Sequence, residues 1–182
     1  MKDFSESPTL SQAVLEMVTV ANEYCLFFEK AESYDTLDIK SYFQKIAPLL
    51  YLKATLLPLI EIDDPSVNER FVTEEQWEYV FKTLRVKFGS HDTYYTHDHN
   101  FDSVQASLAD NMADIYQDLK DFIMLYQKNT EVARQNAIAQ CKDYFTWHWG
   151  PSLLNALAAI HQLLYIEHID PDLLKDESDG LF

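Results

Sequence analysis

The segment SLADNMADIYQDLKDFIMLYQ, residues 107–127, shows the strongest helical periodicity in the sequence and is expected to decide the fold. A helix turns by about 100° per residue, which places the apolar side chains of this segment, together with the preceding Val104, in one continuous stripe. The stripe consists of Val104, Leu108, Met112, Ile115, Leu119, Phe122, Ile123 and Tyr126. We therefore expect a helix from Asp102 to Asn129, with Asp102 as its N-cap and Gln105 as the capping-box partner.

Four aspartates of this helix fall on an adjacent arc of roughly 80°, beside the apolar stripe. This aspartate row consists of Asp110, Asp114, Asp118 and Asp121. It is either a solvated face, or a row of carboxylates that meets a cation, such as arginines of a partner or a metal ion that prefers oxygen. A site requires that at least one carboxylate has a partner. We expect that partner at Asp110 or Asp114, whereas Asp121 is expected to face water.

The composition favours a single all-α domain spanning residues 1–182. With 47% hydrophobic and 14% aromatic residues, the chain is long enough for one sizeable core. Only three glycines occur, which argues against phosphate-binding loops, a dinucleotide fold and a nucleophile elbow. We expect a bundle of about six helices, with loose ends at about residues 1–8 and 170–182.

The charge balance limits the classes of partner. Thirty acidic residues against 14 basic ones give a formal charge of −16, which repels nucleic acids and anionic membranes but attracts a basic protein. The first residues lack an apolar signal segment, and no apolar run approaches the ~18 residues of a membrane span. Cys25 and Cys141 fall on apolar helical faces, so we expect buried free thiols in a reducing, cytoplasmic setting.

Capping patterns predict where the other helices begin. The expected N-caps are Thr9, Asp38, Thr73 and Thr130. The first helix is expected to end near Ser33 and the second at Pro58. Pro48 lies inside the second helix, where it removes a backbone donor, so we expect this helix to be kinked or broken there.

The pair Gly150-Pro151 predicts a tight turn between the fifth and sixth helices, because glycine often follows a helix and proline often begins one. The two helices are therefore expected to form an antiparallel pair. The sixth helix, PSLLNALAAIHQLLYIEH at residues 151–168, is apolar nearly all round, so it should be the most buried helix.

Residues 89–101, GSHDTYYTHDHNF, form the least regular internal segment. Its histidines, the weak candidates for metal ligands, are His91, His97 and His99. No helix or strand visibly holds them in a coordination geometry. Tyr94 and Tyr95 are instead expected to fix the segment to the bundle by burying their rings. The Glu-x-x-His pairs of di-iron bundles do not occur, and no cofactor is evident.

His148 and His161 are both expected to point inward from the last two helices. They stand too far apart along the chain to share one ion, so each is expected to be a core histidine with a hydrogen-bonding neighbour. An imidazole that reaches Asp110 or Asp114 would form a buried pair with perturbed pKa values.

Three stretches together resemble a family of bacterial all-helical domains without an assigned function, found among other places in gut Bacteroidetes. They are LLYLKATLLP at 49–58, SLADNMADIYQDLKDF at 107–122 and FTWHWGPSLLNALAAIHQLL at 145–164. The resemblance implies an all-helical fold and a bacterial cytoplasmic setting, but no reaction. It points to candidate site positions at Asp110, Asp114, Tyr116, Asp118, His148, Trp149, Gly150 and His161.

These observations favour a non-enzymatic interaction module that presents an acidic face to a basic protein. The alternative is a small-molecule or metal-binding pocket, with catalysis left open, built from the aspartate row with Tyr116 and an inward histidine. The 11 phenylalanines, 11 tyrosines and three tryptophans are also more than we expect one core to bury. We therefore expect an exposed aromatic patch that supports a homodimer.

Overall fold

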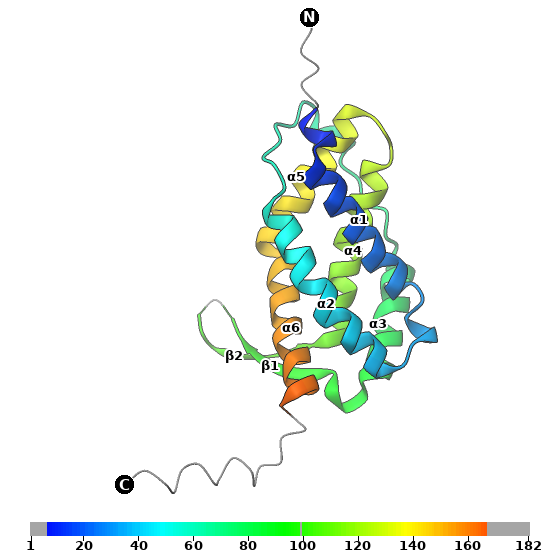
Figure 1. Ribbon diagram of the computed structural model, residues 1–182, viewed down its shortest axis with the longest axis vertical. Coiled ribbons are helices and arrows are strands. Elements are labelled where there is room, and N and C mark those ends of the chain that lie inside the picture. Colours follow the sequence, from blue (N-terminus) through cyan, green and yellow to red (C-terminus); the bar gives the residue numbers. More distant parts are fainter. Residues whose placement is uncertain (1–6, 99, 167–182) are drawn as a thin grey trace, which may run out of the picture.

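In the part of the chain that the structure describes, six helices form a bundle and a two-stranded hairpin projects from its side (Figure 1). The structure is a computed structural model that describes residues 7–98 and 100–166. The helices are α1 Gln12–Phe28, α2 Thr36–Thr55, α3 Glu74–Phe88, α4 Leu108–Tyr126, α5 Glu131–Trp147 and α6 Trp149–Tyr165. The strands are β1 Thr93–His97 and β2 Ser103–Ser107. Apart from this hairpin, the predicted all-α bundle of six helices is confirmed.

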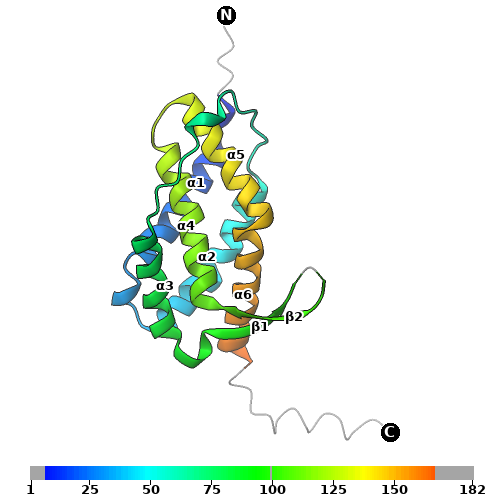
Figure 2. The ribbon, with the colours of Figure 1, turned by 180° about the vertical axis from the view of Figure 1, so that it is seen from behind.

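α4 is the central helix of the bundle and contacts α1, α3, α5 and α6 (Figure 2). Thirteen of its 19 residues are buried, against seven of 17 in α6. The prediction that the sixth helix is the most buried is therefore wrong. The outer side of α6 stays exposed although it carries apolar side chains such as Leu154 and Tyr165.

The central helix is shorter than its apolar stripe predicted. Ser103–Ser107, expected to be its first turns, is strand β2, which pairs antiparallel with β1 in the segment expected to be irregular. Asp102 is therefore not the N-cap. Ser107 caps α4 instead, and its hydroxyl accepts a hydrogen bond from the Asp110 N–H.

A buried carboxylate fixes the point where β2 becomes α4. Asp92 accepts hydrogen bonds from the Ser107 hydroxyl and the Ala109 N–H, both at 2.8 Å, and its carbonyl oxygen accepts one from the Leu108 N–H, also at 2.8 Å. A carboxylate is favourable at a helix N-terminus because free N–H groups and the helix dipole converge there. Asp92 thus supplies the partners that a longer helix would have provided.

The first two helices begin away from the predicted caps. Thr9 lies in a 3₁₀ turn and its buried hydroxyl binds Glu131, while α1 begins later, at Gln12, and ends at Phe28. α2 is capped by Asp35, which accepts a hydrogen bond from the Asp38 N–H. The predicted caps of α3 and α5, by contrast, are confirmed.

Proline does not break the second helix. α2 runs without interruption from Thr36 to Thr55 with Pro48 inside it, so the break does not occur, and the alternative that we expected, a kink at Pro48, stays a prediction. The helix ends before Pro58, and Leu56 is its C-cap.

α5 and α6 follow one another nearly end to end rather than lying side by side (Figures 1 and 2). The predicted antiparallel pair is therefore wrong. Gly150 does not terminate α5 in a left-handed conformation; it lies in the first turn of α6. A Cβ atom at this position would stand 2.0 Å from the carbonyl oxygen of Phe145, so glycine allows the two backbones to approach. His148 is the single residue between the two helices.

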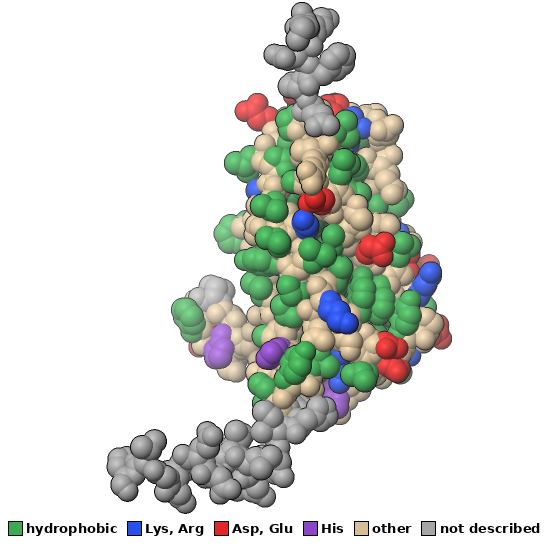
Figure 3. All heavy atoms as spheres, in the orientation of Figure 1, with side chains coloured by type: hydrophobic (Ala, Val, Ile, Leu, Met, Phe, Trp, Pro, Cys, Tyr) green, Lys and Arg blue, Asp and Glu red, His purple; other side chains and the backbone are tan. Residues whose placement is uncertain are grey.

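The surface carries both charged and apolar side chains. Figure 3 shows many hydrophobic side chains on the face where α1, α2 and α6 lie. Exposed large hydrophobic residues of these helices include Leu15, Leu49, Leu52 and Leu154. None of the helices within residues 7–98 and 100–166 combines the length and the apolar character that crossing a membrane requires. Cys25 and Cys141 are buried free thiols, as predicted.

Candidate functional site

The aspartate row runs along α4 from the N-terminal end of the helix into the protein interior. Its first two members, Asp110 and Asp114, are half-buried. Its last two, Asp118 and Asp121, are buried, with 3% and 1% of their surface exposed. The row is therefore not a solvated face, and its two halves differ in burial: the first is half-buried and the second is buried.

Asp121 fastens the segment between α2 and α3 to the centre of the bundle. One carboxylate oxygen accepts hydrogen bonds from the backbone N–H groups of Phe71 at 2.7 Å and Val72 at 2.9 Å. Burial raises the pKa of Asp121, while these two donors and the Arg70 charge lower it. The expectation that Asp121 faces water is wrong, because residues far away in sequence cover it.

Arg70 is the cation that joins the inner half of the row. Its guanidinium lies 3.5 Å from an Asp118 oxygen and 3.4 Å from an Asp121 oxygen, and it covers the ring of Tyr144 at 4.9 Å. Its side chain is 45% exposed, so solvent screens these ion pairs and weakens them. Helical periodicity and capping patterns do not single out Arg70. Its position as one of three arginines, directly after an acidic segment, was the available signal.

His148 approaches the row from the α5–α6 junction. Its Nδ1 lies 2.5 Å from an Asp118 oxygen, and its Nε2 lies 3.9 Å from an Asp114 oxygen. The hydrogen bond to Asp118 is the main cause of a raised pKa at His148, and burial and Arg70 act against it. The predicted contact between a histidine and the row exists, but its hydrogen bond goes to Asp118 rather than to Asp110 or Asp114, and the imidazole is half-exposed rather than buried.

The outer half of the row is less completely neutralised. Asp114 accepts a hydrogen bond from the indole N–H of Trp77 at 3.0 Å. Within the described residues, the Asp110 carboxylate accepts no hydrogen bond. Burial is the main cause of a raised pKa at both aspartates, and repulsion from neighbouring carboxylates adds to it. Asp110 and Asp114 thus form a pair of half-buried carboxylates beside His148, which we call the acidic notch, where a further positive charge would be stabilised.

Three other predicted site residues lie away from this notch. The Tyr116 hydroxyl donates a hydrogen bond to Glu29 of α1 at 3.2 Å. Trp149 is buried in the core, and its indole N–H binds the Cys141 carbonyl. His161 is exposed, with its ring 4.9 Å from that of Tyr165, so its predicted inward orientation is wrong.

His91 and His97, the two candidate metal ligands that the structure describes, belong to no group that could hold a metal ion among the described residues. His91 ends a 3₁₀ turn, His97 ends β1, and His99 lies outside the described residues. Among residues 7–98 and 100–166, no group of three or more histidine, cysteine or acidic side chains has a geometry that would hold a metal ion. Of the two tyrosines expected to bury their rings here, Tyr94 is partly buried and bonds Asn111, whereas Tyr95 is 74% exposed.

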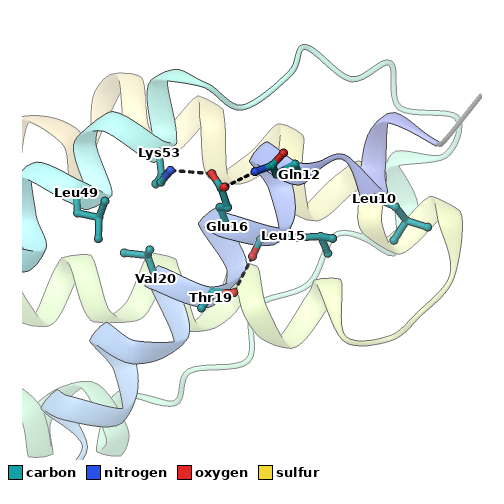
Figure 4. A pocket seen from close by; sticks show the side chains of 8 residues that line it. All are labelled: Leu10, Gln12, Leu15, Glu16, Thr19, Val20, Leu49 and Lys53. Atoms are coloured by element: carbon teal, nitrogen blue, oxygen red, sulfur yellow. Dashed lines mark hydrogen bonds and ion pairs between the residues drawn. The ribbon is translucent and has the colours of Figure 1, made fainter.

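A groove between α1 and α2 lies apart from the aspartate row (Figure 4). Its volume is about 620 Å³, and apolar side chains such as Leu15 and Leu49 line it. Lys53 spans the groove to form an ion pair with Glu16 at 2.7 Å. The pKa of Glu16 is lowered, chiefly by this hydrogen bond, so the charges within the groove balance.

NMR titration is expected to show that His148 holds its proton above the ordinary pKa of about 6.5, because Asp118 stabilises the imidazolium. A pKa raised by folding gives stability that is fully present below about pH 6.5 and is lost as the pH rises through the folded pKa. The difference in melting temperature between the parent and His148→Asn should therefore shrink at high pH. Asp118→Asn should lower the pKa of His148. An unchanged pKa in that variant would contradict the assigned pair.

Comparison with known proteins identifies a matching family and a similar solved structure. A family model described as a domain of unknown function (DUF5063) matches residues 8–166. The crystal structure of protein BF1032 from Bacteroides fragilis is similar, with a TM-score of 0.80 and 34% sequence identity, covering 87% of this chain and 96% of that one. No curated protein matches the sequence significantly.

Proposed function

The chain belongs to the DUF5063 family of domains of unknown function, and we propose that it is an interaction module whose acidic notch receives a cationic side chain of a basic protein. The observation that carries this proposal is that the carboxylates of Asp110 and Asp114 are partly buried and incompletely neutralised. They lie one helical turn apart and are half-buried, and among the described residues the half-exposed His148 is the cationic group paired with them, 3.9 Å from Asp114.

The physical chemistry of the notch favours a cation. Two carboxylates that have lost part of their hydration repel one another, and an ammonium or guanidinium group placed between them offsets both effects. Asp118 and Asp121 do not offer the same opportunity, because Arg70, His148 and backbone N–H groups already bind them. The cation is therefore expected to contact the outer half of the row.

The charge of the whole chain supports the same class of partner. A formal charge of −16 attracts basic proteins and speeds their association at low ionic strength. Long-range attraction of this kind is not specific, so the notch has to supply the specificity. Binding that depends on the notch should lose less affinity at high salt than binding that depends on the overall charge, because partly buried pairs are screened less.

A labelled peptide of alternating lysine, arginine and glycine residues tests the proposal by fluorescence anisotropy. The double variant Asp110→Asn/Asp114→Asn is expected to weaken binding about tenfold, or about 1.4 kcal/mol. Glu61→Gln/Glu74→Gln is the matched control, since it removes the same charge from two exposed positions. Equal losses in both double variants, or no binding by the parent, would refute the notch as the docking site.

The Asp118–His148 pair supports a second candidate function, a pocket for a small ligand. A buried carboxylate on Nδ1 orients the imidazole and leaves Nε2 to exchange a proton with a ligand, as in general acid–base sites. In this case His148→Asn should abolish ligand binding, whereas the basic peptide should still bind to that variant.

We propose a bacterial cytoplasm as the setting. The buried, unpaired thiols of Cys25 and Cys141 suit a reducing compartment, and the similar structure comes from a bacterium.

A further inference from the structure

The β1–β2 hairpin stands out from the bundle beside α6 (Figures 1 and 2). One of its faces carries half-buried residues such as Tyr94 and Thr96, and the Thr96 hydroxyl bonds Asn155 of α6 at 3.1 Å. Thr93, Tyr95 and His97 of β1 are exposed. A two-stranded hairpin is marginally stable by itself, and each strand leaves one edge of backbone groups without a partner in the sheet.

The hydrogen-bond pattern shows which backbone groups form the free edge of β1. Just outside the two ends of the ladder, the Leu108 N–H binds the Asp92 carbonyl at 2.8 Å and the Asp98 N–H binds the Asp102 carbonyl at 3.0 Å. Hydrogen-bonded pairs recur at every second residue of an antiparallel ladder. In this register Tyr94 and Thr96 bond across to β2, whereas Thr93, Tyr95 and His97 direct their N–H and C=O groups away from it.

Both strands are short, but neither carries a charged residue, a proline or a bulge that would protect its free edge. Edge strands of monomeric proteins carry charged residues, prolines or bulges that prevent pairing with another chain. The sequences TYYTH and SVQAS contain no Asp, Glu, Lys, Arg or Pro, although the chain has 30 acidic residues. The register is continuous from Thr93 to His97, without a bulge.

We propose that β1 pairs with β1 of a second copy of this chain, antiparallel across a two-fold axis, to give a four-stranded sheet. Tyr95 then lies opposite Tyr95 of the partner subunit. An antiparallel pair of identical strands is self-complementary, as a two-fold interface requires. Two chains that each carry a charge of −16 repel one another. Because β1 is uncharged, contact through this strand adds little local electrostatic repulsion.

The edge of β1 is a better dimer edge than that of β2. All of its outward residues are exposed, whereas the β2 edge ends at Ser107, whose side chain is engaged by Asp92 and the Asp110 N–H. If the two-fold axis passes beside Tyr95, the two β1 strands form three hydrogen-bonded residue pairs, with about six backbone hydrogen bonds in total. It also brings the two exposed tyrosine rings together as a cross-strand pair. The interface is small, so the dimer should dissociate on dilution.

Sedimentation analysis over a range of concentrations tests this dimer. The parent is expected to approach twice the monomer mass at the highest concentrations. Tyr95→Pro removes an outward N–H without touching the β1–β2 ladder, and should stay monomeric. Tyr95→Glu leaves the backbone intact but sets two charges opposite each other, and should weaken dimerisation at least tenfold.

The matched control is Gln105→Pro, which removes the corresponding outward N–H from β2. It should dimerise like the parent. Circular dichroism and thermal melting establish that each variant is folded. A parent that stays monomeric would overturn the proposal, and so would a dimer that survives Tyr95→Glu or is lost only in Gln105→Pro. The result is independent of peptide binding at the acidic notch.

Discussion

Replacing Asp121 with alanine is expected to lower the free energy of unfolding by about 2–4 kcal/mol, because it leaves two buried backbone donors without an acceptor. The Phe71 and Val72 N–H groups both bind the same Asp121 oxygen, at 2.7 and 2.9 Å. The contact to Arg70 adds little to this loss, since its guanidinium is half-exposed and can turn toward water.

Urea denaturation of the parent and two variants measures this effect. Asp110→Asn is the matched control on the same helix, since its carboxylate accepts no hydrogen bond within the described residues. It should change stability by less than about 0.5 kcal/mol. Hydrogen exchange at Phe71 and Val72 should also accelerate in Asp121→Ala, because the segment before α3 loses its attachment. Equal stabilities for the two variants would show that Asp121 does not hold that segment.

The aspartate row illustrates what helical periodicity predicts and what it does not. Side-chain spacing correctly placed the four aspartates beside the buried stripe of α4. It gave no information about which other segment covers each position, because that depends on contacts across about 50 residues, such as Phe71 with Asp121. Distance from the helix N-terminus suggested exposure at Asp121, yet the segment before α3 passes over it. The hydrogen bond of His148 goes to Asp118 rather than to the expected Asp110 or Asp114, and its Nε2 only approaches Asp114 to 3.9 Å.

The start of the central helix was misplaced for a related reason. Val104 fits a helical stripe with Leu108, but it also fits the alternation of a strand, and five residues are too few to separate the two periods. The decisive contacts are the pairing with β1 and the carboxylate of Asp92, which both come from a segment with no regular pattern. Local propensity could not reveal either contact.

The predictions for His148 and His161 differ in accuracy because the two residues lie at different positions relative to the helices. His161 lies inside α6, and its side was misjudged because α6 was expected to be surrounded by other helices rather than placed at the edge of the bundle. His148 lies between two helices, where a helical wheel does not apply, and its backbone is not helical. Its place beside Asp118 depends on how α5 and α6 meet.

That junction requires glycine at position 150, and Gly150→Ala is expected to cost about 3 kcal/mol or more. An alanine Cβ would stand 2.0 Å from the Phe145 carbonyl oxygen, far inside contact distance, so α6 would have to move relative to α5. Ser152→Ala, two residues along the same helix, is the control and should change stability by less than about 0.5 kcal/mol.

The double variant Gly150→Ala/Phe145→Ala identifies the group responsible for the clash. The same Cβ would also meet the Phe145 ring at 3.0 Å, and a truncated ring would relieve only that contact. Because the carbonyl oxygen remains, Phe145→Ala should not restore the stability of Gly150→Ala in a double-mutant cycle. The displaced junction should also carry His148 away from Asp118, so that its pKa falls toward the ordinary value of about 6.5. A stable Gly150→Ala protein with an unchanged His148 pKa would show that the α5–α6 junction does not position the imidazole.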